Sequence, residues 1–213
     1  MAYNQFTIDD VKQKLGVRVH EATDLFAAVP PAAPGAWLTD LLKDSVPLAL
    51  AISTEKARSE LIIAPVLLEV RRRRGGAVSL FSGTEFDVDA ERGLTGFCDW
   101  LLARSPEQLT VEAPVVAIVE AKNENIRQGV AQCLAELVAA REFNARRSRP
   151  VGAVHGAVTT GDLWRFMRLR GDLAEVDLSQ FHIQSLDRIL GVLLAMVAEE
   201  ATAPPLPEPG AVQ

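Results

Sequence analysis

The sequence has few of the residues that build disulfide frameworks or zinc sites. It contains two cysteines, Cys98 and Cys133, and three histidines among 213 residues. Two cysteines do not make a disulfide framework, and no cysteine or histidine has the spacing of a zinc site. No apolar run reaches the roughly 18 residues of a membrane-spanning helix, and the N-terminus lacks the pattern of a secretory signal. We therefore expect a cytoplasmic protein that does not enter a membrane.

The sequence also lacks the excess of basic residues that is typical of proteins coating nucleic acids. It has 22 Lys and Arg against 28 Asp and Glu, which gives a net charge of −6. Binding by charge alone needs many basic contacts to phosphates, so this class is disfavoured. A local basic patch beside an acidic site is still compatible with the composition. Two groups could form one: the arginines at 71–74, for which we favour a solvated helix end, and Arg141, Arg146, Arg147 and Arg149.

The composition, 48% apolar and 23% charged, suits a globular protein with a sizeable core. We predict helices over residues 7–16, 37–50, 54–74, 125–147 and 183–200, of which 37–50 has mixed periodicity and 54–74 is apolar on nearly every side. Thr7 and Asp10 have the spacing of a capping box, and Pro65 should kink the third helix. Strand-like runs occupy residues 78–88, 94–103, 115–122, 151–159 and 163–170, with a short extended piece near Val176.

The order of these elements predicts a mixed sheet with helices packed on it, an α/β (α+β) fold. Strands 78–88 and 94–103 should form an antiparallel hairpin. A strand, a crossover helix and a further strand from 115 to 159 imply parallel pairing. We divide the chain into a helical extension packed on the core (1–50), a main domain (51–201) and a Pro-rich tail (202–213) that cannot build a core.

The most informative motif is Glu120-Ala121-Lys122, at the end of the apolar run 115–119. Successive strand residues point to opposite faces, so Glu120 and Lys122 should share one face. Asp99 lies about 20 residues upstream in a second strand-like run. A carboxylate beside an ammonium, with a second carboxylate from a neighbouring strand, can hold a divalent cation and a water next to each other.

With these motifs the sequence resembles the PD-(D/E)XK nuclease superfamily over residues 54–194. It is similar in particular to a group of bacterial proteins, common in cyanobacteria, that share this layout. The segments that carry the resemblance are TEKARSE (54–60), FSGTEF (81–86), GFCD (96–99), EAK (120–122), QCLAE (132–136) and VTTGDLWRF (158–166). The last segment also resembles a part of type I restriction motor subunits near their N-terminal nuclease domain. Cys98 stands where the family's Pro-Asp pair has its proline, which many members of the family lack.

The resemblance implies a restriction-endonuclease-like mixed sheet flanked by helices, and it implies roles for individual residues. Asp99 and Glu120 would bind Mg²⁺ or Mn²⁺, with the backbone carbonyl of Ala121 as a further ligand. Lys122 would position or activate the attacking water. Glu60 matches an acid that can join the metal ligands, and Gln132 matches a glutamine that some branches place beside the site.

Each of these residues also has a structural interpretation. Glu120 and Lys122 could form a simple ion pair, although Asp99 within the apolar run 97–101 is costly unless it is paired or metal-bound. Glu60 could pair with Lys56, and the helical wheel does not decide where Gln132 faces. Other polar or aromatic residues we assign to the surface, to packing or to the core: Glu85, Asp87, Asp89, His20, His155, His182, Trp164 and Phe166.

We therefore expect a Mg²⁺-dependent nuclease that cleaves DNA in preference to RNA. One alternative is an inactive module that keeps the fold for binding or assembly. Another is a subunit that is active only with a partner in a restriction, defence or repair complex. The apolar helix 183–197 could serve as core or as the face of a homodimer.

Overall fold

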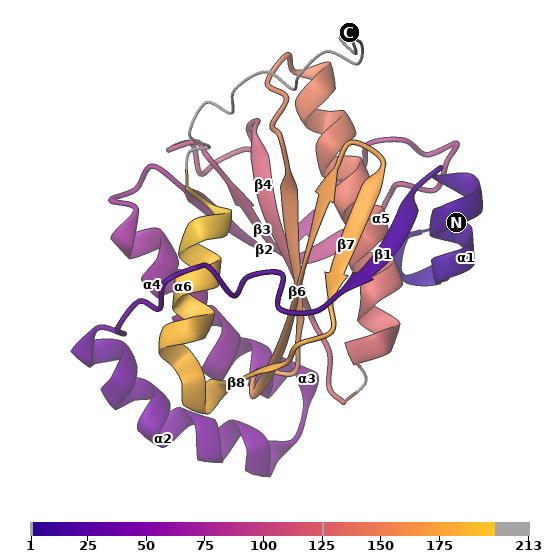
Figure 1. The fold of residues 1–213 in the computed structure, drawn as a ribbon. Coiled ribbons are helices and arrows are strands. Elements are labelled where there is room, and N and C mark those ends of the chain that lie inside the picture. Colours follow the sequence, from indigo (N-terminus) through magenta and orange to yellow (C-terminus); the bar gives the residue numbers. More distant parts are fainter. Residues whose placement is uncertain (1, 125, 199–213) are drawn as a thin grey trace, which may run out of the picture.

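In the computed structural model, residues 2–124 and 126–198 are described. An eight-stranded mixed sheet forms the centre of the molecule, and helices pack on both of its faces (Figure 1). The predicted mixed α/β fold, a mixed sheet flanked by helices, is confirmed.

The N-terminal segment contains a strand that the sequence analysis does not predict. Helix α1 (Ile8–Lys14) begins as expected: the Thr7 hydroxyl accepts a hydrogen bond from the Asp10 N–H at 3.1 Å, and the Asp10 carboxylate accepts one from the Thr7 N–H at 3.0 Å. Strand β1 (Arg18–Ala22) follows and pairs in parallel with β7 (Leu173–Asp177) at one edge of the sheet. Residues 2–50 thus supply a strand of the sheet as well as helices.

The helical region before the main strands is divided more finely than predicted. Helix α2 (Ala36–Ile52) covers the expected helix 37–50. The expected helix 54–74 is one helical run from Glu55 to Arg73 that consists of α3 (Glu55–Arg58), a π-helical turn η2 (Ser59–Ile63) and α4 (Ala64–Arg73), with right-handed helical backbone at both junctions. Pro65 lies in the first turn of α4, where the missing N–H is tolerated. The wide turn directly before it takes the place of the kink that we predicted within one helix.

The strands are ordered β1-β7-β6-β5-β4-β3-β2, with β8 paired to β6. Their bounds are β2 (Ser79–Glu85), β3 (Phe97–Ala103), β4 (Val115–Ala121), β5 (Val154–Thr159), β6 (Leu163–Arg170) and β8 (Phe181–His182). The β2–β3 pair is antiparallel, and β4 and β5 are parallel and joined by α5 (Ile126–Arg146). Both pairings agree with the sequence analysis, whose strand and helix ends differ by a few residues.

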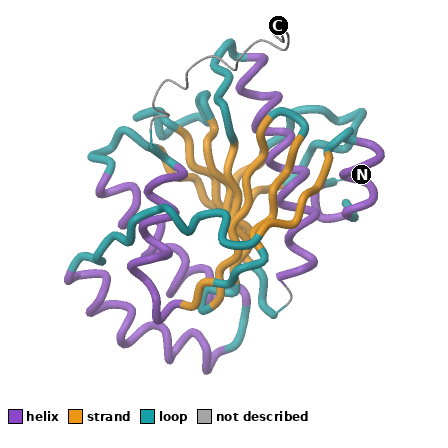
Figure 2. Tube along the Cα trace, viewed as in Figure 1, coloured by secondary structure: helices purple, strands orange, loops and turns teal. Residues whose placement is uncertain are grey.

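The sheet separates two apolar cores. On one face, α5 and α1 cover a core that includes Leu134, Val138 and Ile118. On the other face, helices α2, α4 and α6 (Leu186–Met196) cover a core that includes Leu67 and Leu190 (Figures 1 and 2). The end of β4 therefore lies between two well-packed layers, which fixes the residues around it.

Helix α6 follows a short 3₁₀ turn, η3 (Ile183–Ser185), and ends earlier than the predicted residue 200. Its apolar residues Ile189, Leu190 and Leu193 are buried in the core, so this face of the helix is core and is not available to a second copy of the chain. The predicted Pro-rich tail, 202–213, lies outside the described residues. Among the residues described, no helix is both long and apolar enough to cross a bilayer.

Candidate active site

Strand β4 carries Glu120 into the centre of the sheet. Every residue of this strand is buried, and Glu120 exposes 1% of its surface. Lys122 follows the strand directly, and its backbone N–H donates a hydrogen bond to the carbonyl of Thr159 in β5 at 2.8 Å. Because this bond continues the pairing of β4 with β5, the strand-like alternation extends to Lys122, which lies on the same face as Glu120.

Asp99 reaches the same place from β3. The antiparallel register of β3 and β4 pairs Trp100 with Val119. Just beyond that pair, Oδ2 of Asp99 accepts a hydrogen bond from the backbone N–H of Ala121 at 2.8 Å. The two carboxylates are close enough that the charge of Asp99 acts on Glu120. The acids from two separate strand-like runs are thus brought together at the end of β4.

The Lys122 ammonium lies between a carboxylate and an amide. Its Nζ donates a short hydrogen bond to Oε1 of Glu120 and a second one, 3.3 Å long, to Oε1 of Gln132 in α5. Gln132 therefore faces the site, which the helical wheel alone did not decide. The three side chains form a chain of contacts from β4 to α5.

Glu136 is a site residue that the sequence analysis did not single out. Its Oε1 accepts a hydrogen bond from Nε2 of Gln132 at 3.1 Å, and its side chain is fully buried. This contact fixes the orientation of the Gln132 amide, so that the amide oxygen points to Lys122. The available signal was an acid four residues after Gln132, on the same face of a helix, within the otherwise nonpolar stretch 133–140.

Glycine at position 129 lets α5 approach the site closely. A Cβ at this position would lie 2.5 Å from Cγ1 of Val158 and 3.2 Å from Cγ of Lys122. Only a residue without a side chain leaves room for the aliphatic part of Lys122 between α5 and the sheet. Gly129 therefore contributes to the position of the ammonium group.

The site holds more acidic than basic groups in a buried setting. Burial, and next the charge of Asp99, raise the pKa of Glu120 to about 8, although Lys122 opposes them. Burial also raises the pKa of Glu136 well above its ordinary value, with Glu120 adding to the effect. For Lys122, burial lowers the pKa, but the charges of Glu120 and Asp99 outweigh it and the pKa is raised. Three carboxyl groups share one ammonium, which favours the binding of a further cation.

Glu60 lies beside the site but is engaged elsewhere. It borders a cavity of about 250 Å³ that is also lined by Asp99 and Ala121. Its carboxylate forms an ion pair with Lys56 at 2.6 Å, and its side chain is 58% exposed. The structural interpretation of Glu60, a pair with Lys56, is therefore the one that the contacts show.

The donor set fits a cation that needs few protein ligands. Among the described residues, no three Asp, Glu, His or Cys side chains form a ready-made metal site. Asp99 and Glu120 nevertheless supply two carboxylates, and Oε2 of Glu120 is buried without a hydrogen-bond partner in the described part of the chain. Mg²⁺ prefers oxygen ligands and keeps several waters, so Asp99, Glu120 and the carbonyl of Ala121 are the groups that could hold it.

The remaining polar candidates have structural roles. Asp87 accepts a hydrogen bond from the Gly96 N–H at 2.8 Å, and Asp89 accepts one from the Arg92 N–H at 3.2 Å, so both stabilise the turn between β2 and β3. Trp164 and Phe166 are completely buried, as predicted for core residues.

The two basic groups are also largely engaged within the protein. Arg72 and Arg73 pair with the buried Glu69. Arg74 and Arg141 donate to the carbonyls of Leu194 and Gly171, respectively. Arg146 contacts the carbonyl of Val88 and the carboxylates of Asp89 and Glu142, and Arg147 lies over the ring of Phe143.

Comparison with known proteins adds no assignment to this geometry. No protein-family model matches the chain, and no curated protein sequence matches it.

Proposed function

We propose that the chain is a nuclease that uses Mg²⁺ or Mn²⁺ to hydrolyse phosphodiester bonds, in DNA rather than RNA. The observation that carries the proposal is the meeting of Asp99, Glu120 and Lys122 at the end of β4, where Oε2 of Glu120 is buried without a partner. A buried carboxylate oxygen of this kind is costly unless a cation or a hydrogen-bond donor satisfies it. The resemblance to the PD-(D/E)XK nucleases points to the same chemistry.

The residues would divide the work in the following way. Asp99, Glu120 and the Ala121 carbonyl hold the cation, which supplies Lewis-acid stabilisation of the phosphate charge and lowers the pKa of a bound water. Asp99 is fixed for this task by its hydrogen bond to the Ala121 N–H. This bond joins β3 to β4 directly and so holds the Asp99 carboxylate at the end of the strand that carries Glu120.

Lys122 would stabilise the negative charge that develops during attack on the phosphate. The raised pKa of Lys122 keeps the ammonium protonated at neutral pH. A fixed cation in a buried site stabilises such charge more strongly than it would in water. Gln132, held in turn by Glu136, accepts a hydrogen bond from this ammonium and limits its rotation.

A cleavage assay tests the proposal. Single- and double-stranded DNA, and RNA of the same sequence, are incubated with the full chain in Mg²⁺, Mn²⁺ or EDTA. We expect cleavage of DNA that requires metal and is lost in Glu120→Gln. Cleavage that persists in EDTA, or that is unchanged in the variant, would contradict the proposal.

A further inference from the structure

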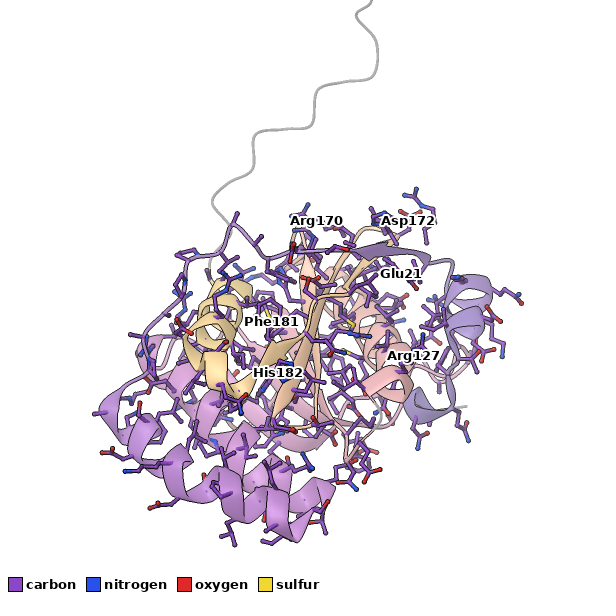
Figure 3. The ribbon with its side chains drawn as sticks, turned by 60° about the horizontal axis from the view of Figure 1, so that its bottom comes forward. Glu21, Arg127, Arg170, Asp172, Phe181 and His182 are labelled. Atoms are coloured by element: carbon purple, nitrogen blue, oxygen red, sulfur yellow. The ribbon has the colours of Figure 1, made fainter. Side chains whose placement is uncertain are left out.

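A second cavity lies next to the candidate active site, on the same face of the sheet. It measures about 450 Å³, within the range of small-ligand sites, and it lies between α1, the N-terminal part of α5 and strands β1, β6 and β7. Its residues are Ile8, Lys12, Val19, Glu21, Arg127, Val130, Arg165, Val176 and Leu178. Figure 3 shows Glu21 and Arg127 on the side of the sheet where α1 packs. We call this space the cationic cavity because three basic residues line it.

The cationic cavity is next to the space in front of Lys122. A neighbouring cavity of about 590 Å³ is lined by Lys122 and Gln132, and it shares Ile8 and Arg127 with the cationic cavity. A ligand that reaches Lys122 through this neighbouring cavity can therefore extend past Arg127 into the cationic cavity. The two cavities lie side by side, one at the candidate active site and the other towards β1.

Arg165 is the basic residue of the cationic cavity whose side chain has a buried nitrogen without a hydrogen-bond partner in the described part of the chain. It comes from β6, where it pairs with Val158, and it is half-buried. Its Nε is buried and has no hydrogen-bond partner among the described residues, and no ion pair of Arg165 is found in that part of the chain. A buried guanidinium N–H without a hydrogen-bond partner is costly. A bound anion would remove that cost.

The charges around the cavity suit a phosphate. Lys12 and Arg127 add two positive charges, and Glu21 contributes one negative charge. No ion pair links Glu21 to Lys12 or Arg165 within the described residues, so the carboxylate does not neutralise these two side chains. Arginine binds phosphate through paired N–H groups and lysine as a point charge. The aliphatic wall formed by Val19, Val130 and Val176 provides a surface for an apolar group attached to the phosphate.

We propose that the cationic cavity binds an internal phosphate, with its nucleoside, of an unpaired nucleic-acid strand whose scissile phosphate lies at Lys122. This inference rests on the proposed nuclease function, because the shared border with the Lys122 cavity is what makes the ligand a continuing strand. An unpaired strand fits because a cavity of this size accommodates a small ligand of about one nucleotide and excludes a duplex. The enzyme should accordingly prefer single-stranded DNA or an unpaired flank.

Binding measurements with the full chain test the inference separately from cleavage. Fluorescence anisotropy in EDTA compares a labelled single strand with the duplex of the same sequence. Arg165→Gln removes the half-buried cation, and Arg170→Gln is the matched control, because Arg170 lies on the same strand, is exposed and is far from Arg127 in Figure 3. Lys12→Gln, with the exposed Lys43→Gln as its control, is a second test that does not risk the core.

We expect Arg165→Gln to weaken single-strand binding about tenfold and to reduce the salt dependence by about 0.7 in logarithmic slope, with a smaller loss for Lys12→Gln. Unchanged affinity in both variants would overturn the inference, and so would tighter binding of the duplex than of the single strand. A strict requirement for a terminal phosphate would overturn the assignment to an internal phosphate. Failure of metal-dependent cleavage, with these binding effects intact, would instead count against the proposed reaction.

Discussion

The carboxylate of Asp99 accepts a hydrogen bond from the backbone N–H of Ala121 at 2.8 Å. Ala121 is the middle residue of the Glu-x-Lys motif, so this bond joins the first acid to the motif itself. It fixes β3 against β4 at the point where their regular pairing ends. A change at Asp99 should therefore disturb both the position of the motif and the charge of the site.

Metal binding should stabilise the folded protein through Asp99 and Glu120. A ligand that binds only the folded state contributes about 2.7 kcal/mol at a concentration of 100 times its Kd. Differential scanning calorimetry should show a higher Tm with Mg²⁺ or Mn²⁺ for the wild type and no such increase for Asp99→Asn. Glu60→Gln is the matched control, because Glu60 is paired with Lys56, and it should keep the increase. An equal increase in all three proteins would place the metal elsewhere.

The stability of the metal-free protein should fall as pH rises. Burial raises the pKa of Glu120 from 4.5 to about 8. In this window the folded protein holds a proton that the unfolded chain releases, so the free energy of unfolding decreases by up to about 1.4 kcal/mol per pH unit. Urea denaturation in EDTA across this range should show a shallower decline for Glu120→Gln. A wild-type stability that increases with pH would contradict this account of the site.

Gln132 should matter for turnover and much less for metal binding. It accepts a hydrogen bond from the Lys122 ammonium but has no carboxylate to offer a cation. Gln132→Ala should lower kcat about 10- to 100-fold, as expected for a partner that orients a functional group, with Mg²⁺ affinity by calorimetry close to wild type. The exposed Gln13→Ala is the control. A loss of metal affinity as large as the loss of kcat would assign Gln132 a different role.

The close approach of α5 should make Gly129 intolerant of a methyl group. Gly129→Ala places a Cβ 2.5 Å from Val158, and overpacking of this kind costs about 1–3 kcal/mol, more than the gain of about 1 kcal/mol in helix propensity. Urea denaturation should show the net loss. A variant as stable as the wild type would mean that α5 can move away from Lys122, and its activity would then show whether that distance matters.

The parts of the fold with strong periodicity were predictable. The continuous apolar run of β4 and the helical spacing along α5 specify their elements, and the crossover between them requires parallel pairing. Strand β1 was missed because only Val19 and Ala22 are apolar among its five residues, so its position depends on pairing with β7. The π-helical turn before Pro65 could not be predicted either, because the local sequence indicates one continuous helix and carries no signal for a wider turn.

The residues of the sequence motifs at the site were predictable, whereas a residue that reaches the site only through the packing of a helix on the sheet was not. Asp99, Glu120 and Lys122 stand out because a charged group within or at the end of an apolar strand is costly unless it is paired or metal-bound. Glu136 carries no such mark, because a glutamate in a helix is usually exposed. Only the packing of α5 on the sheet shows that Glu136 is buried and that Gln132 points to Lys122.

The most direct test of the central claim is the single-turnover rate of DNA cleavage in Mg²⁺ for Lys122→Ala beside Lys56→Ala. Both variants remove an ammonium that pairs with a glutamate, but only Lys122 lies at the meeting point of Asp99, Glu120 and Gln132. We predict that Lys122→Ala loses at least about a hundredfold in rate while Lys56→Ala stays close to the wild type. Equal rates in the wild type and Lys122→Ala would contradict the account.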